Sequence, residues 1–153
     1  MAATVVDLAE EIVTILTDAT FTTAATVKRR WRPKHKIADG DLDSPQITVT
    51  PVNLYLEIQN RTRNGETWGI GVLLQQKLSA PAITGEDESE ADALALLAQE
   101  IRDELKRISF TLDTETVKAS PTGITQSVPQ DPDDLDDHSV FTNLDVFTYL
   151  VIR

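Results

Sequence analysis

Apolar residues recur at the spacing of an amphipathic helix in two stretches of the chain. The first extends roughly from Val5 to Asp18, with Thr4 before it as a candidate N-cap. The second extends roughly from Ser89 to Arg107 and starts among acidic residues, which suit the positive pole of a helix dipole. Each stretch has one apolar stripe: Val5, Leu8, Ala9, Ile12 and Leu16 in the first, and Leu94, Leu97, Ala98, Ile101, Leu105 and Ile108 in the second. We therefore predict two helices, the second of which lies across a sheet.

Alternation of apolar and polar positions predicts a long hairpin in the middle of the chain. Its first strand leads in from Val52, and its second extends from Trp68 to Leu78. Asn64-Gly65 tolerates the positive φ angles of a type I′ turn, so this dipeptide is expected to connect the two strands. Gly69 and Gly71 leave one face of this strand without side chains at two positions, and we expect a helix to pack closely against that face.

Four further stretches have the pattern of strands. Thr26 to Arg32 predicts an edge strand that Pro33 ends, and Gln46 to Thr50 predicts one that Pro51 ends or bends through a bulge. A short strand is expected at Phe110 and Leu112. Val140 to Arg153 is apolar on both faces, so this strand either lies in the middle of the sheet or has one face covered by another subunit.

Two polar stretches, 33–45 and 113–139, are rich in proline, glycine and aspartate, and we predict extended loops or arms there. These patterns together predict an α+β fold, in which a mostly antiparallel β-sheet of about four to five strands packs with two α-helices. At 153 residues and 41% hydrophobic composition, the chain is expected to form one domain, 1–153.

Composition removes several classes of chemistry. The chain has no cysteine, which excludes disulfides, thiolate metal sites and a cysteine nucleophile. The N-terminal residues have no basic region before an apolar run, and no stretch reaches the roughly 20 apolar residues that span a bilayer, so we expect a cytosolic protein or one assembled in a cytosol.

The net charge of -11 is unevenly distributed along the chain. Of the 25 acidic residues, 16 lie at or after Glu86, whereas the segment 28–36 contains six of the 14 basic residues and no acidic one. Its cations are Lys28, Arg29, Arg30, Arg32, Lys34 and Lys36, and Arg61 and Arg63 are candidates to extend the same surface. Cations beside Trp31 fit nucleic acid, but on so acidic a chain we favour a contact with an acidic protein surface or the lining of a pore.

The remaining chemical motifs are incomplete. The acidic run 131–137 lacks the glycine and the glutamate of a calcium loop, and the two histidines, His35 and His138, lie far apart in sequence. We therefore predict no catalytic, cofactor-binding or metal-binding residue and no cofactor, and consider an enzyme improbable. A divalent-metal hydrolase stays as an alternative that would need carboxylates to converge in a pocket.

The order of elements resembles that of the tail terminator and head-tail joining proteins of tailed bacteriophages. The resemblance rests on a helix, a basic strand, the proline-ended strand 47–51, a hairpin with Arg61 and Arg63 near its tip, an acid-started helix and an aromatic C-terminal strand. It implies a hexameric ring, closed by heterologous contacts, that terminates the tail tube and joins it to the head.

The resemblance also implies partners and a location. These are copies of the same chain, the tail tube protein and head-completion or connector proteins, in a virion tail or neck assembled in the host bacterial cytoplasm. Genomic DNA would pass through the ring without specific binding, and no membrane would be contacted. The basic segment would meet Glu86 to Glu90 or Asp131 to Asp137 of the next subunit, with Phe147 and Tyr149 as further interface candidates. Another neck or connector protein of the virion and a small nucleic-acid-binding module are the alternatives.

Overall fold

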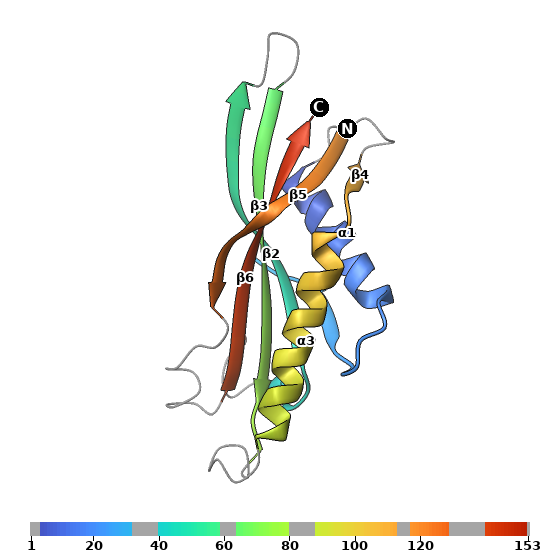
Figure 1. The fold of residues 1–153 in the computed structure, drawn as a ribbon, viewed down its shortest axis with the longest axis vertical. Helices are drawn as coiled ribbons and strands as arrows, with labels where there is room; N and C mark the ends of the chain where they lie inside the picture. Colours follow the sequence, from blue (N-terminus) through green and yellow to red (C-terminus); the bar gives the residue numbers. More distant parts are fainter. Residues whose placement is uncertain are drawn as a thin grey trace.

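In the described part of the chain, two α-helices cover one face of a curled, mostly antiparallel sheet of six strands (Figure 1). The computed structural model describes residues 4–31, 40–58, 64–79, 88–112, 117–128 and 140–152. In chain order the elements are α1 (Val5–Asp18), β1 (Thr26–Arg29), the 3₁₀ helix η1 (Gly40–Asp43), β2 (Gln46–Ile58), β3 (Asn64–Lys77), α3 (Ser89–Lys106), β4 (Phe110–Leu112), β5 (Val117–Val128) and β6 (Val140–Ile152). The predicted α+β class is confirmed, but the predicted count of four to five strands is too low.

The two helices form where the apolar stripes predicted them. At the start of α1, the Thr4 backbone N–H donates to the Asp7 carboxylate at 2.6 Å, and the Asp7 N–H donates to the Thr4 hydroxyl at 3.4 Å. This reciprocal capping box satisfies N–H groups that a helix start leaves unpaired. In α3, Ser89 is the first helical residue, and the side chain of the N-cap residue Glu88 makes no capping hydrogen bond.

The long hairpin is present, but its turn is not where the sequence placed it. Asn64 pairs with Ile58 and Gly65 pairs with Glu57, so the Asn-Gly dipeptide lies inside β3 and the connection falls on residues 59–63, outside the described residues. The pairing register shifts between Pro51 and Asn53. This shift confirms that Pro51 marks a bulge within one bent strand.

The glycine-bearing face of β3 is not the face that the helices cover, so that prediction was wrong. A Cβ atom at Gly71 would lie 3.0 Å from Cγ2 of Val52 and 3.1 Å from Cγ2 of Thr50. Side chains of the neighbouring strand therefore fill the space above this glycine. The helices instead pack on the face that carries Trp68 and Ile70, which are 1% and 0% exposed.

The prediction of one long polar loop over 113–139 was wrong for its middle part. Val117–Val128 forms β5, which pairs with both β4 and β6, while 113–116 and 129–139 lie outside the described residues. β5 places β6 between two neighbours, so the C-terminal strand is central, as one of the two predicted alternatives required. The other predicted loop, 33–45, contains η1 with the fully buried Leu42, and its part 33–39 is not described.

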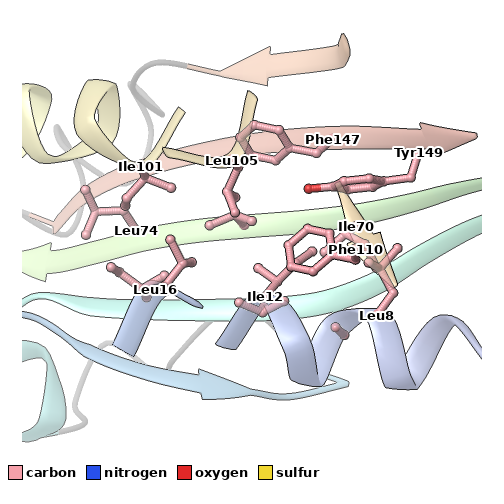
Figure 2. Packing of buried hydrophobic residues seen from close by; sticks show 14 of the residues in the cluster. Leu8, Ile12, Leu16, Ile70, Leu74, Ile101, Leu105, Phe110, Phe147 and Tyr149 are labelled. Atoms are coloured by element: carbon pink, nitrogen blue, oxygen red, sulfur yellow. The ribbon is translucent and has the colours of Figure 1, made fainter. Parts of the chain in front are cut away.

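The core lies between the helices and the covered face of the sheet. Figure 2 shows Leu8, Ile12 and Leu16 of α1 and Ile101 and Leu105 of α3 meeting side chains of β3, β4 and β6. Residues from both ends of the chain therefore share one apolar cluster. Because the helices and β1 pack against this cluster, it determines which of their side chains face solvent.

Candidate interaction surface

Strand β1 forms one edge of the sheet and is its parallel strand, with Thr26 beside Gln46 and Arg29 beside Val49 of β2. The N–H groups of Thr26 and Arg30 donate to the carbonyls of Pro45 and Val49, each at 3.0 Å. Because backbone groups alternate in direction along a strand, Val27 and Arg29 turn theirs toward the open edge. The predicted edge strand is confirmed, although it ends at Arg29 instead of Arg32.

The Arg29 side chain connects β1 to α1 and to an exposed aromatic ring. Its Nε donates to the carboxylate of Glu10 on α1 in an ion pair. Its guanidinium carbon lies 5.9 Å from the centroid of the Trp31 ring, which is within the range of a cation–π contact. The Trp31 residue remains 65% exposed. The Trp31 ring is therefore exposed to solvent while it contacts the Arg29 side chain, which is held by Glu10 of α1.

The other predicted basic residues divide into described and undescribed groups. Lys28 is exposed, and it has no ion-pair partner within the described part of the chain, whereas Arg30 is half-buried and already bonded to β2 through its backbone. Arg32, Lys34, Lys36, Arg61 and Arg63 lie outside the described residues, so their role at an interface stays a prediction.

Phe147 and Tyr149 do not lie on the surface, and the prediction that they contact a partner was wrong. They are 2% and 0% exposed, and Tyr149 meets the ring of Phe110 edge to face at 5.9 Å between centroids. Both side chains belong to the core cluster under the helices (Figure 2). Their aromatic character on a central strand reflects packing within the subunit.

A buried polar cluster between α3 and β6 was not predicted from the sequence. Arg102 donates through Nε to Asp145 at 2.8 Å and through Nη2 to Asn143 at 3.1 Å, and the Asp145 side chain is only 3% exposed. Alternation along β6 places Asn143 and Asp145 on the same face as Phe141 and Phe147, and this polar interruption of an apolar face was a signal for a buried cluster. The cluster ties α3 to the sheet.

A second polar contact inside the core was also missed. The indole Nε1 of Trp68 donates to the Glu66 carboxylate at 2.7 Å, and Glu66 is 8% exposed. The two residues are neighbours on one face of β3, because they are two positions apart. Their bond gives a polar partner to the largest side chain of the core.

Other kinds of site receive little support from the described residues. No group of three or more histidine, aspartate or glutamate side chains in the described ranges is placed to hold a metal ion. A surface hollow of about 230 Å³ is lined by Lys106, Pro121, Thr122, Gly123 and Phe147, with one ionisable group among them. Among the helices of the described ranges, none is long and apolar enough to cross a membrane.

Comparison of the sequence with protein-family models and with curated proteins finds no match. The fold and the surface around β1 are therefore the basis for a functional proposal.

Proposed function

We propose that this chain is a structural subunit of a tailed bacteriophage, which forms a ring that terminates the tail tube and joins it to the head. The proposal rests on the resemblance in element order, and it is supported by an architecture of two helices on one face of a mostly antiparallel sheet. The single observation that carries it furthest is the basic edge strand β1 with the exposed Trp31, on a chain whose acidic residues all lie elsewhere.

A ring of identical subunits needs two unlike surfaces on each copy that match one another. The edge around β1 provides one, with Lys28 exposed on the strand and Trp31 exposed just after its end. Exposed carboxylates on the two helices, such as Glu11 and Asp92, provide an acidic surface of the opposite kind. Opposite charges on different surfaces favour a head-to-tail arrangement over a symmetric pair.

The charged groups that the described core brings together have structural roles in this proposal. Asp145 is held by Arg102 and Glu66 is held by Trp68, and both carboxylates are almost fully buried. Such groups stabilise one arrangement of α3 and β3 on the sheet and have no access to a substrate. The protein would act through its surfaces and not through turnover.

Mass and shape in solution test the proposal. With a subunit of 16.9 kDa, a closed ring of six would have a mass of roughly 100 kDa. Size-exclusion chromatography with light scattering, followed by negative-stain imaging, should show this mass and a central hole, either for the protein alone or after addition of phage tail tubes. A stable dimer, or a monomer that binds no tube end, would contradict the proposal. Another neck protein of the same virion would form a ring that binds the head connector but not the tube.

A nucleic-acid-binding module is the second candidate, and the contact of Trp31 with Arg29 together with the exposed Lys28 favours it. An exposed ring can stack a base while cations neutralise phosphates. Its signature would be DNA affinity that falls steeply as salt rises, with a slope that reports several phosphate contacts. We expect no such affinity, because the chain carries a net charge of -11.

A further inference from the structure

We propose that Trp31 of one copy packs against Leu96 on the outer face of α3 of the next copy, with Lys28 facing the aspartates that flank Leu96. This inference rests on the ring proposed above and names the two surfaces that would close it. Within the described residues, the large apolar side chains with strong exposure are Trp31, Val52 and Leu96, at 65%, 48% and 48%. Trp31 follows the basic strand β1, whereas Leu96 lies between Asp92 and Asp103 on α3.

Trp31 has the properties of an anchor residue for a protein contact. Tryptophan is enriched among the few residues that carry most of the binding energy of interfaces. The cation–π contact with Arg29, itself paired with Glu10, holds the ring near one orientation before any partner arrives. Less side-chain freedom is then lost on binding, which favours association.

Leu96 lies in the middle of an exposed stripe on α3. Asp92, Leu96, Gln99 and Asp103 are spaced by three or four residues, so they share one face of the helix, opposite the buried Leu94, Leu97, Ile101 and Leu105. All four residues of the stripe are exposed, and the Gln99 amide donates to the Asp103 carboxylate at 2.9 Å. A leucine between two aspartates complements an exposed tryptophan at the end of a basic strand in both apolar and charged character.

Charge identifies the occupant of each surface as a second copy of this chain. The segment 28–36 is basic without a single acid, and the remainder of the chain is strongly acidic, so a basic surface finds its complement on another copy. The two surfaces differ, so a pair of subunits still has one free Trp31 surface and one free Leu96 surface. Further copies can therefore add until the ring closes.

The absence of cysteine from the chain allows a direct test of proximity. Trp31→Cys and Leu96→Cys are made separately, mixed at a concentration well above the one at which wild type assembles, because each variant loses part of the contact, and treated with a short bismaleimide. The reagent is needed because packed tryptophan and leucine hold their Cβ atoms beyond the roughly 4 Å of a disulfide. The mixture should give a cross-linked dimer that neither variant gives alone. Val52→Cys is the matched control, because Val52 is as exposed as Leu96 but lies over Gly71 on the sheet face away from the helices.

Two outcomes of the cross-linking, and one of a fluorescence titration with DNA, would overturn the inference. Equal cross-linking of Val52→Cys with Trp31→Cys would indicate random encounter. Cross-linking of Trp31→Cys with itself would indicate a symmetric contact. Loss of Trp31 fluorescence on addition of DNA, read against the buried Trp68, would assign the surface to nucleic acid.

Substitutions measure the same contact without a reagent. Trp31→Ala should weaken assembly on the order of 30-fold or more, as expected for a tryptophan anchor, while circular dichroism stays unchanged because the ring is exposed. Lys28→Glu should also weaken assembly, and adding Asp92→Lys and Asp103→Lys to the same chain should restore it. Lys118→Glu, at an exposed lysine of β5, is the control and should assemble as wild type does.

The results separate this inference from the proposed function. Rings that persist unchanged in Trp31→Ala and Lys28→Glu would refute the contact and leave the ring proposal intact. A wild-type protein that neither forms rings nor binds a tube end would refute the proposed function itself.

Discussion

At the scale of single residues, the Tyr149 hydroxyl is a polar group that the fold buries without satisfying it. Among the described residues it is a buried side-chain atom without a hydrogen-bond partner, and it points into the apolar cluster (Figure 2). An unsatisfied buried hydroxyl costs roughly 1–3 kcal/mol relative to its hydrated state. Tyr149→Phe should therefore raise the free energy of unfolding by about 1 kcal/mol, measured by urea denaturation at pH 7. A loss of stability of that size would mean that the hydroxyl has a partner.

The effect of Tyr149→Phe on the free energy of unfolding depends on pH. Burial raises the pKa of the Tyr149 phenol above its ordinary value near 10, because the folded state disfavours the charged form. Below pH 10 the phenol is protonated in both the folded and the unfolded state, so its contribution to the free energy of unfolding is constant. Above pH 10 the unfolded state loses its proton first, so wild type loses stability as pH rises. The gap between Tyr149→Phe and wild type should widen from pH 8 to pH 10.5, whereas a constant gap would contradict a raised pKa.

The Arg102 guanidinium offers a second measurement at this scale. Arg102→Met leaves the Asp145 carboxylate buried without its cation, which should lower the free energy of unfolding by about 3 kcal/mol. Arg107→Met is the matched control on the same helix, because the Arg107 side chain is 75% exposed and lies 3.8 Å from Glu104. An exposed pair is worth at most about 1 kcal/mol. Equal losses for the two variants would show that the buried cluster is unimportant for stability.

Partners at this scale are hard to predict from sequence. Arg29 was correctly placed on an edge strand, but its ion pair with Glu10 depends on α1 lying beside β1, which is a matter of tertiary packing. Lys28 remained exposed as expected, whereas Phe147 and Tyr149 were taken for surface residues because apolar alternation cannot show which neighbour covers a face. Asn143 and Asp145 carried a visible signal, since polar residues on an apolar strand face require partners.

At the scale of elements, two adjacent leucines of α3 separate stability from assembly. Leu97 is 1% exposed and faces the core, so Leu97→Ala should lower the free energy of unfolding by about 2–5 kcal/mol. Leu96 faces solvent, and Leu96→Ala should change stability by about 0.5 kcal/mol or less while it impairs assembly. Chemical denaturation of both variants measures the first effect and light scattering the second. A large stability loss in Leu96→Ala would mean that this face is covered within the subunit.

Elements with a strong local pattern were predictable, and those that depend on distant pairing were not. The bounds of α1 and the bulge at Pro51 follow from capping chemistry and proline geometry. Strand β5 has the polar, proline- and glycine-containing sequence of a loop, and it becomes a strand because β4 and β6 supply hydrogen bonds on both sides. The turn was misplaced because Asn-Gly is favourable in a type I′ turn but also pairs within β3, so the local preference lost to the strand register.

For the whole molecule, the order of strands was beyond the reach of the sequence. Antiparallel pairing of β2 with β3 follows from a hairpin, but the parallel pairing of β1 with β2 and the insertion of β6 between β3 and β5 join segments far apart in the chain. These pairings decide which surfaces are open. They place Trp31 near a sheet edge and cover Tyr149, which is why the candidate interface could be outlined from charge but not assigned to particular residues.

Charge also predicts how assembly of the whole molecule responds to salt. If Lys28 faces aspartates across the contact, raising ionic strength from 0.1 to 1 M shortens the screening length from about 10 to 3 Å and should weaken assembly of wild type. Trp31→Ala should be weaker at every salt concentration but keep the same dependence, because its charges are intact. Lys28→Glu should lose the dependence or reverse it. Light scattering over a concentration series measures all three, and association of wild type that strengthens with salt would show that apolar burial alone drives it.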